Sequence, residues 1–507
     1  MSKGTELPIG WMRTTVQEVY EVVGGGTPST TKSAFWSGNI PWITSADING
    51  LKKISARKLI TQEAIDNSAT SLVPKNSIVV VTRVGLGKVG LADKPLCFSQ
   101  DCQGLIGDNN LILPNYALYY LSQVVQTFKH SSRGTTIPGV TKKQLKELEF
   151  LLPPSNEQCR IVAKIEELFS DLDAGISALE RIQVNLKRYR ASVLKAAVEG
   201  KLTEEWRAEH PDVEPAGELL KRILDERQKK WEEDQLAKYA VKGKKPPKNW
   251  KEKYKKPAAY EISNLSALPK GWVWTTIDCI SVTQTGGTPL RSHAEYYNGN
   301  IPWVKSGELG DSIVRSTAEK ITSVGLAESS AKLFPKGTLC IALYGATVGK
   351  LGILDIEAAT NQAVCGIFLP QDLVTKFIYY YLLFIRTSII RKGKGGAQPN
   401  ISNTIVKQIH IPLPPKTEQQ HIVAEIENRL SIADDADSIL VVDLKRAARL
   451  RQSILKRAFE GKLVPQDPND EPASILLERI KTEREKAEKA NQQSKIKRRR
   501  KRKNHVN

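Results

Sequence analysis

Three glycines, Gly85, Gly87 and Gly90, have the spacing of the dinucleotide-binding motif G-x-G-x-x-G and follow an apolar, strand-like run. In that motif the glycines bring the backbone close to a pyrophosphate where a helix begins. Here no clear helix begins after the third glycine and no acidic residue follows at the usual spacing. A related segment from Gly345, GATVGKLG, also breaks the spacing. A turn that glycine permits is therefore favoured over a nucleotide site.

A Gly-Lys pair is common to both segments, at Gly87-Lys88 and at Gly349-Lys350. The glycine has no side chain, so its backbone can come close to a phosphate, and the lysine that follows supplies a positive charge. An exposed lysine in an ordinary turn explains the same pair, so both interpretations stay open.

Motifs for group transfer are missing from the sequence. An adenine methyltransferase needs Asn or Asp, then Pro-Pro and an aromatic residue, to hold a flipped base. The Leu-Pro-Pro segments at 152–155 and 413–416 instead have the features of helix entrances, with Glu157 and Glu418 in the first turn. No Walker motif for a translocase occurs, and the segment 211–215 lacks the lysine of a nuclease core. We expect the chain to be catalytically inert by itself and to bind no cofactor.

Cysteine usage and hydropathy indicate a reducing cytoplasm. No Cys-x-x-Cys pair or neighbouring histidine cluster supports a zinc site or a disulfide framework. The six cysteines are Cys97, Cys102, Cys159, Cys279, Cys340 and Cys365. The N-terminus lacks the apolar core of a signal peptide, and the longest apolar run, 377–390, is short and contains Arg386. We expect no membrane contact and a buried helix at that run.

An internal repeat organises the elements that carry these residues, because adding 261 to a residue number repeatedly reaches the same residue type. The matched segments begin at Leu7 and Leu268 (LPxGW), Gly25 and Gly286 (GGTP), Asn39 and Asn300 (NIPW), Pro74 and Pro335 (PK), Leu152 and Leu413 (LPP), and Ser192 and Ser453 (SxLKxAxEGKL). The chain is therefore a tandem duplication with pseudo-twofold character, in which a globular part precedes a helical part.

Each globular part, 7–150 and 268–410, combines short strand-like runs with Gly and Pro and an aromatic-rich helix near Tyr119 or Tyr380. This is typical of an α/β (α+β) domain. We expect domains at 1–152 and 258–412, helical regions at 153–257 and 413–494, and a basic tail at 495–507.

The helical parts show a seven-residue apolar period that predicts an antiparallel coiled coil between two long helices. The first series is Ile165, Leu172, Leu179, Leu186 and Val193, with Ile161, Leu168, Ile182 and Tyr189 between them. The second series is Ile426, Ala433, Leu440, Ala447 and Ile454. Two helices that are buried separately, each on its own domain, are the alternative.

Charge is concentrated where contact with a polyanion would need it. The formal net charge is +20, with 75 Lys and Arg against 55 Asp and Glu. The ranges 1–150 and 268–410 each carry +5, the tracts 242–256 and 495–503 carry +7 and +8, and the remainder carries −5. Such tracts are usually solvated, with nucleic acid as a second interpretation. Two equally basic globular parts favour two DNA-facing modules.

The order and duplication of these motifs resemble the specificity subunits of type I restriction-modification enzymes, over nearly the whole chain. The resemblance implies two target recognition domains, each of which reads one half of a bipartite site in double-stranded DNA. It also implies helices that set the gap and dock two methyltransferase subunits, with restriction (translocase) subunits added for cleavage. Methylation is then on adenine, with S-adenosylmethionine held by the partner subunit.

Polar and basic loops at equivalent places of both globular parts supply the candidates for contact with bases and phosphates. In the first half they are Thr27, Ser29, Lys32, Arg83, Lys88, Arg133 and Thr135. In the second half they are Thr288, Arg291, Tyr344, Lys350, Arg391, Lys392, Lys394 and Gln398. An ordinary surface role is the alternative for each. The halves differ at these loops, which predicts an asymmetric site.

Four tryptophans, Trp11, Trp42, Trp272 and Trp303, are expected in the core rather than as platforms for stacked bases. Two other functions stay open. One is a DNA methyltransferase or nuclease that acts alone, against which the missing motifs count. The other is a helical scaffold without a DNA role, against which the basic globular parts count.

Overall fold

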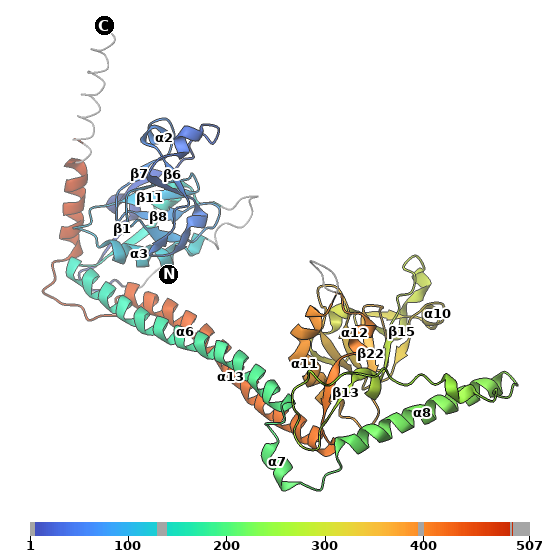
Figure 1. Cartoon of the computed structure of the whole chain (residues 1–507). Helices are drawn as coiled ribbons and strands as arrows, with labels where there is room; N and C mark the ends of the chain where they lie inside the picture. The colour runs from blue at the N-terminus through green and yellow to red at the C-terminus, as the bar shows by residue number, and fades with distance from the viewer. Residues whose placement is uncertain (1–5, 129–138, 394–399, 487–488, 490–507) are drawn as a thin grey trace. The chain divides into compact units, whose positions relative to one another are not determined.

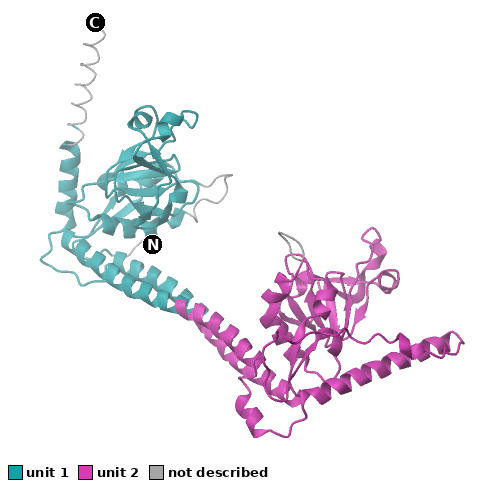
Figure 2. Cartoon of the chain, in the orientation of Figure 1, with its two compact units in different colours: residues 1–180, 441–507 teal, residues 181–440 magenta. Residues whose placement is uncertain are grey.

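The computed structural model describes residues 6–128, 139–393, 400–486 and 489. The chain divides into two compact units, which Figure 2 draws in different colours. Unit 1 contains residues 1–180 together with 441–507, and unit 2 contains residues 181–440. Unit 1 is therefore made from both ends of the chain, whereas unit 2 is continuous in sequence.

Unit 1 is built on two four-stranded sheets. The first is antiparallel, in the order β2-β11-β8-β9, and consists of β2 (Glu21–Gly24), β8 (Ile78–Val81), β9 (Val89–Leu91) and β11 (Cys102–Ile106). The second has the order β6-β3-β10-β7 and consists of β3 (Ile40–Ile43), β6 (Lys58–Ile60), β7 (Leu72–Val73) and β10 (Leu96–Phe98). Strand β3 is parallel to β10, and the other pairs of this sheet are antiparallel.

Two short pairs of strands and several helices complete unit 1. The pairs are β1 (Met12–Thr15) with β12 (Glu149–Leu152), and β4 (Ile48–Gly50) with β5 (Lys53–Ile54). The helices are α1 (Val16–Val19), α2 (Gln62–Asp66), α3 (Pro114–Val124), α5 (Lys142–Lys146), the start of α6 (Ser155–Val198), the end of α13 (Lys416–Phe459) and a last helix at 473–486.

Unit 2 repeats this plan with a five-stranded sheet, β14-β22-β19-β20-β16, and a four-stranded sheet, β17-β15-β21-β18. The first contains β14 (Val282–Thr285), β16 (Ser312–Val314), β19 (Leu339–Ala342), β20 (Leu351–Leu354) and β22 (Val364–Phe368). The second contains β15 (Tyr297–Val304), β17 (Glu319–Ile321), β18 (Leu333–Phe334) and β21 (Ala358–Thr360). Strands β13 (Val273–Thr276) and β23 (His410–Leu413) pair separately.

The helices of unit 2 are the end of α6, the start of α13, α7 (Glu204–Glu209), α8 (Ala216–Val241), α9 (Ile277–Ile280), α10 (Ser323–Ala327), α11 (Thr375–Arg391) and α12 (Asn403–Lys407) (Figure 1). The apolar run 377–390 lies in α11 and supplies buried residues such as Phe377 and Ile378, as predicted. No helix in the described part of the chain is long and apolar enough to span a membrane.

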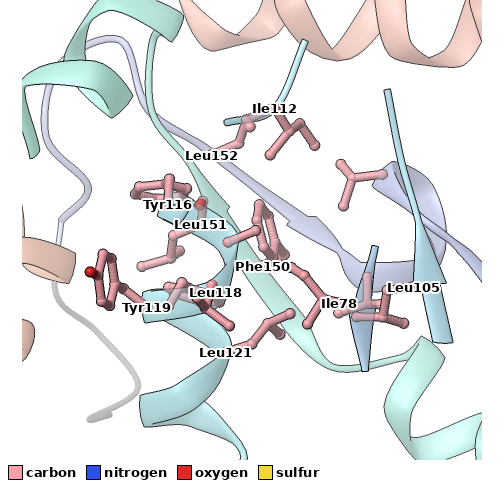
Figure 3. Packing of buried hydrophobic residues seen from close by; sticks show 14 of the residues in the cluster. Ile78, Leu105, Ile112, Tyr116, Leu118, Tyr119, Leu121, Phe150, Leu151 and Leu152 are labelled. Carbon is pink, nitrogen blue, oxygen red and sulfur yellow. Dashed lines mark hydrogen bonds between the residues drawn. The ribbon is translucent and has the colours of Figure 1, made fainter. Parts of the chain in front are cut away.

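The core of each domain follows from apolar side chains on both faces of its central strands. All four residues of β8, Ile-Val-Val-Val, are buried, because both faces of the strand are covered. Figure 3 shows Tyr116 of α3 and Phe150 of β12 in this core, with ring centroids 6.2 Å apart. Phe459, from the far end of the chain, meets the Tyr116 ring at 5.8 Å.

The helical parts close these cores. In unit 2, α8 contributes Ala216, Leu219 and Ile223. In unit 1, the equivalent residues come from the last helix and are Ala473, Leu476 and Ile480. The first domain is therefore completed only by the end of the chain.

The two long helices each run for 44 residues without a break. In unit 1 the start of α6 lies with the end of α13, where Ile165 and Leu455 share one apolar cluster. In unit 2 the end of α6 lies with the start of α13, where Val193 and Ile426 share another. The helices are therefore antiparallel, as predicted.

The predicted seam is confirmed in α13, where four of its members are buried: Ile426, Ala433, Leu440 and Ala447. In α6 the prediction is wrong for the intervening positions Ile182 and Tyr189, whose side chains are 46% and 39% exposed. A pair of helices buries one stripe of each partner, so an apolar face beside that stripe stays open to solvent.

All six cysteines are free, and only Cys159 is exposed. Burial raises the pKa of the Cys97 thiol to about 11. Within the described residues, no group of three or more His, Cys, Asp or Glu side chains could hold a metal ion.

Candidate nucleic-acid interface

The GGTP segments are held against the sheets in a way that only glycine allows. A Cβ atom on Gly26 or Gly287 would lie 2.5 Å or 2.3 Å from a backbone carbon of the segment beside it. The indole nitrogens of Trp42 and Trp303 donate to the carbonyl oxygens of these glycines, at 3.0 Å and 3.1 Å. Both tryptophans are buried, which confirms that they are core residues.

Each GGTP threonine binds a glutamine at the surface. The Thr27 hydroxyl donates to Gln100 Oε1 at 2.6 Å, and the Thr288 hydroxyl donates to Gln362 Oε1. Both glutamines are exposed. Because the threonine occupies the amide oxygen, the amide NH2 group of each glutamine is left as a donor.

These two glutamines are absent from the sequence-based candidates. They are equivalent at an offset of 262 rather than 261, because the second half has one additional residue in the turn before Gly349-Lys350. A comparison of the halves that allowed for this shift would have found them.

The glycine-rich segments 82–88 and 343–350 are turns, as predicted. Gly85 and Gly87 have φ angles of +89° and +86°, and Gly345 and Gly349 have +87° and +75°. A strand, β9 or β20, follows each turn, so no helix begins there to hold a pyrophosphate.

The two turns present different side chains at equivalent places. Arg83 Nε lies 3.9 Å from Asp101 Oδ1, and the arginine side chain is 49% exposed. Tyr344 occupies the corresponding place in unit 2. Burial raises its pKa above the ordinary value, against the opposing effect of a hydrogen bond with Gln362.

Backbone hydrogen bonds connect these segments into one edge in each unit. Val140 N donates to Thr82 O at 2.7 Å, and Ile401 N donates to Leu343 O at 2.7 Å. We call these surfaces the reading edges. In unit 1 the reading edge consists of 26–29, 82–88, 99–101 and 139–140; in unit 2 it consists of 287–290, 343–350, 360–363 and 400–401.

The two Gly-Lys lysines have different partners. Lys88 Nζ donates to the carbonyl oxygen of Ser45 at 3.1 Å. Lys350 Nζ lies 3.0 Å from Asp311 Oδ2, and Arg386 binds the same carboxylate. Burial acts to raise the pKa of Asp311, but hydrogen bonds from the Leu351 N–H and from these cations hold it below its usual value. Lys350 is therefore anchored more firmly than Lys88.

Three further candidates lie in or shortly after the GGTP segments: Ser29 belongs to the reading edge of unit 1, and Lys32 and Arg291 follow in sequence. Ser29 is exposed. Lys32 Nζ lies 5.0 Å from the centre of the Phe35 ring. Arg291 contacts a tyrosine ring at 4.5 Å and Glu319 Oε2 at 2.9 Å, so its guanidinium already has partners within the domain.

Two basic candidates, Arg391 and Lys392, are exposed at the end of α11. The neighbouring Ile390 would lie 3.1 Å from a Cβ on Gly349, so this helix end packs on the turn of the reading edge. The other candidates lie outside the described residues: Arg133, Thr135, Lys394 and Gln398.

Two of the repeated motifs serve a different purpose, which is to seat each domain on its long helix. Trp11 Nε1 donates to Glu157 Oε2 at 2.9 Å, and Trp272 Nε1 donates to Glu418 Oε2 at 2.8 Å. All four residues are buried, so both tryptophans are core residues as predicted. The tryptophan of LPxGW and the glutamate after LPP are therefore structural partners.

The glutamine after each of these glutamates continues the contact. Gln158 Oε1 accepts from Leu113 N at 2.9 Å, and Gln419 Oε1 accepts from Val374 N at 3.0 Å. These bonds fix the segment before α3 and α11 on the first turn of the long helix.

The family described as the type I restriction modification DNA specificity domain matches residues 8–181 and 269–432. The chain belongs to this family. Each match spans a globular part and the beginning of a long helix, so the predicted tandem duplication and fold class are confirmed. As a type I specificity subunit, the chain is a non-catalytic DNA-recognition component of a restriction-modification system.

Relatives match this type I specificity subunit over most of its length. It is 23% identical to the MjaIX specificity subunit of Methanocaldococcus jannaschii, with 90% of this chain and 94% of that protein covered. It is 24% identical to the EcoDI specificity subunit of Escherichia coli, with 96% and 97% covered.

Solved structures share the fold. The HsdS subunit from Thermoanaerobacter tengcongensis aligns with a TM-score of 0.54 at 18% identity, over 91% of this chain and 99% of that one. A chain from a structural study of complex assembly and conformational transition of the type I R-M system aligns with a TM-score of 0.60, also at 18% identity, over 90% and 100%.

Proposed function

We propose that this specificity subunit reads a bipartite, asymmetric site in double-stranded DNA through two target recognition domains, assigned to residues 1–152 and 258–412. The observation that carries the proposal is the pair of reading edges, which share one backbone plan but present different side chains. Arg83 beside Asp101 stands in one, and Tyr344 beside Gln362 stands in the other. Equivalent edges with different chemistry suit two half-sites of different sequence.

The shared part of each edge suits base contact in the major groove. A glutamine amide can bind the adenine edge, and arginine can bind guanine. Gln100 and Gln362 are positioned by the threonine bonds, which lowers the entropy lost on binding. Arg83 has an anionic partner only at 3.9 Å, and an exposed pair of this kind contributes about 0–1 kcal/mol, so its release costs little.

The open face of the helix pair supports docking of methyltransferase subunits. In unit 2, Ile432 and Ile439 of α13 are each 61% exposed, and Ile182 and Tyr189 of α6 are also exposed. Apolar side chains one heptad apart on a helix suit an apolar helix of a partner. Methyl transfer to adenine and cleavage belong to the partner subunits in this proposal.

Methylome sequencing of the host with and without this chain tests the function. We expect loss of one bipartite methyladenine motif when the chain is deleted. An unchanged methylome, or methyl transfer by the purified chain alone, would overturn the proposal. Gln100→Ala and Gln362→Ala form a matched pair, and each should weaken discrimination at one half-site only, by about 1–3 kcal/mol.

A further inference from the structure

Helix α8 and the segment that returns along it form an arm in unit 2, which we call the basic arm (residues 225–256). The N-terminal part of α8 packs on the second domain, where Ala216, Leu219 and Ile223 are buried. From Asp225 onward no residue of α8 is buried. Figure 1 shows α8 extending beyond the strands of its unit.

The returning segment is held on the helix by aromatic side chains. The Trp231 ring lies 5.9 Å from the Trp250 ring at an interplanar angle of 18°, and 5.3 Å from the Tyr254 ring. Lys251 Nζ is 2.8 Å from Glu232 Oε2. A lysine-rich tract that only solvated the protein would need no such clamp, because fixing each residue costs roughly 1–2 kcal/mol of backbone entropy.

The turn at the tip is also defined. Gly243 has a φ angle of +60°, and the N–H groups of Gly243 and Lys244 donate to the carbonyl oxygens of Ala240 and Tyr239. These bonds satisfy the last carbonyls of α8 and reverse the chain. The lysines on both sides of the turn are therefore carried by a folded element.

Positive charge on the arm is concentrated in the end of α8 and the returning segment, whereas the acidic residues of the arm, apart from Glu252, lie at 225–234. Residues 238–256 contain nine lysines and one acidic residue, Glu252. Among the residues that the structure describes, only one of these lysines, Lys251, has an ion-pair partner. The exposed lysines without one are Lys238, Lys242, Lys244, Lys245, Lys248, Lys253, Lys255 and Lys256.

We propose that the basic arm binds the sugar–phosphate backbone of double-stranded DNA independently of sequence. This inference rests on the proposed function, because it adds a contact to the DNA that the reading edges would hold. Clustered lysines that lack anionic partners are suited to replace the counterions of a duplex. An acidic protein partner fits less well, because lysine is depleted at protein interfaces and three aromatic side chains of the arm, Trp231, Trp250 and Tyr254, are occupied by the clamp.

The test compares variants of the full chain, co-purified with the methyltransferase subunits of its own system, on a duplex of about 40 base pairs of arbitrary sequence. One variant changes Lys242, Lys244, Lys245, Lys248 and Lys253 to glutamine. The matched control changes the same five lysines to arginine and so keeps the charge. A third variant, Trp231→Ala, keeps every charge but opens the clamp.

We expect the glutamine variant to lower the slope of log K against log salt by up to about 0.9 for each lost contact, and to weaken binding at low salt by roughly tenfold or more. The arginine control should bind as the parent does, and Trp231→Ala should fall between the two. The methylated motif should keep its bases in all variants. An unchanged salt slope in the glutamine variant would overturn the role of the arm, whether or not the methyltransferase still co-purifies.

The outcome is separable from that of the proposed function. If the glutamine variant keeps its salt slope and the methylome still depends on the chain, only the arm proposal fails. If the glutamine variant keeps its slope but loses the methyltransferase subunits, the arm contacts an acidic protein surface instead, and the proposal is also wrong. A parent complex without affinity for any duplex overturns both.

Discussion

Trp11 donates its indole N–H to Glu157 Oε2 across 2.9 Å, and both side chains are buried. The equivalent Glu418 accepts from Trp272 and also from Thr203 at 2.7 Å and Arg207 at 2.8 Å. Burial raises the pKa of Glu157, against the weaker opposing effect of the Trp11 bond. The same motif therefore supports two different electrostatic environments.

This difference predicts unequal responses to a matched substitution. Glu157→Gln keeps an oxygen for the Trp11 indole and removes a charge that burial disfavours, so the free energy of unfolding at pH 7 should change by less than about 1 kcal/mol. Glu418→Gln leaves Arg207 without its carboxylate and should destabilise unit 2 by about 1–3 kcal/mol. Thermal unfolding followed by tryptophan fluorescence measures both. Equal losses would show that the additional partners of Glu418 contribute nothing.

The raised pKa of Glu157 also predicts a pH dependence. A carboxyl group whose folded pKa is raised stabilises the protein fully below its unfolded pKa, and this contribution is lost as the pH rises through the folded pKa. Unit 1 of the unaltered chain should therefore lose stability relative to Glu157→Gln between about pH 4 and neutral pH. A difference that stays constant over this window would contradict the assignment.

Because each long helix is unbroken for 44 residues, its length should set the gap between half-sites. Insertion or deletion of about one heptad in both helices, between Leu172 and Leu186 and between Ala433 and Ala447, shifts the ends by about 10 Å. The gap should then change by about three base pairs, while the specific bases stay the same. Methylation mapping checks this, and altered bases with an intact gap would refute it.

The two domains should exchange independently. Replacement of 268–410 by the same region of another family member should switch one half-site only, since the reading edge of unit 1 uses residues of 26–140 alone. Mapping the DNA motif that the hybrid complex methylates tests this prediction. A change in both half-sites would mean that the two readers are coupled.

A fragment of residues 1–257 contains one reader, one long helix and α8. It should dimerise through its helix and, with partner subunits, methylate an inverted repeat of the first half-site. In the dimer Val198 takes the place of Phe459, which otherwise packs on Tyr116 and Tyr120. Val198→Phe should therefore stabilise the dimer by about 1–3 kcal/mol, and Val198→Ala should weaken it. Light scattering and thermal unfolding measure these effects; a folded monomer, or a Phe variant without gain, would contradict them.

Docking on the exposed helical face predicts a selective loss of assembly. Ile439→Glu should abolish co-purification of the methyltransferase while the subunit itself stays folded, because this side chain is 61% exposed. Ser431→Glu, on the same helix, is the matched control and should assemble normally. Assembly of the Ile439→Glu complex at full yield would place the docking surface elsewhere.

Local patterns in the sequence were sufficient to predict the repeat, the glycine turns, the buried tryptophans and the pairing of the two long helices. Local patterns did not predict contacts between side chains that lie far apart in the sequence. The carboxylate that binds Lys350 belongs to Asp311, 39 residues earlier in the chain. Asp311 has a φ angle of +59°, which the neighbouring sequence does not predict. The open position of Ile182 depends on how many helices surround α6, which periodicity alone does not specify.

Completion of the first domain by residues 455–480 has a consequence for synthesis of the protein. Unit 2 is continuous in sequence, so all of its residues have been synthesised once the ribosome has passed Leu440. The apolar surface around Tyr116 in unit 1 is covered only after Phe459 and the last helix have been synthesised. At about 5–20 residues per second, that surface stays uncovered for roughly 15–70 s after it is made. The domain that is translated first is thus finished last, and its need for a chaperone is greatest while the second domain is still being translated.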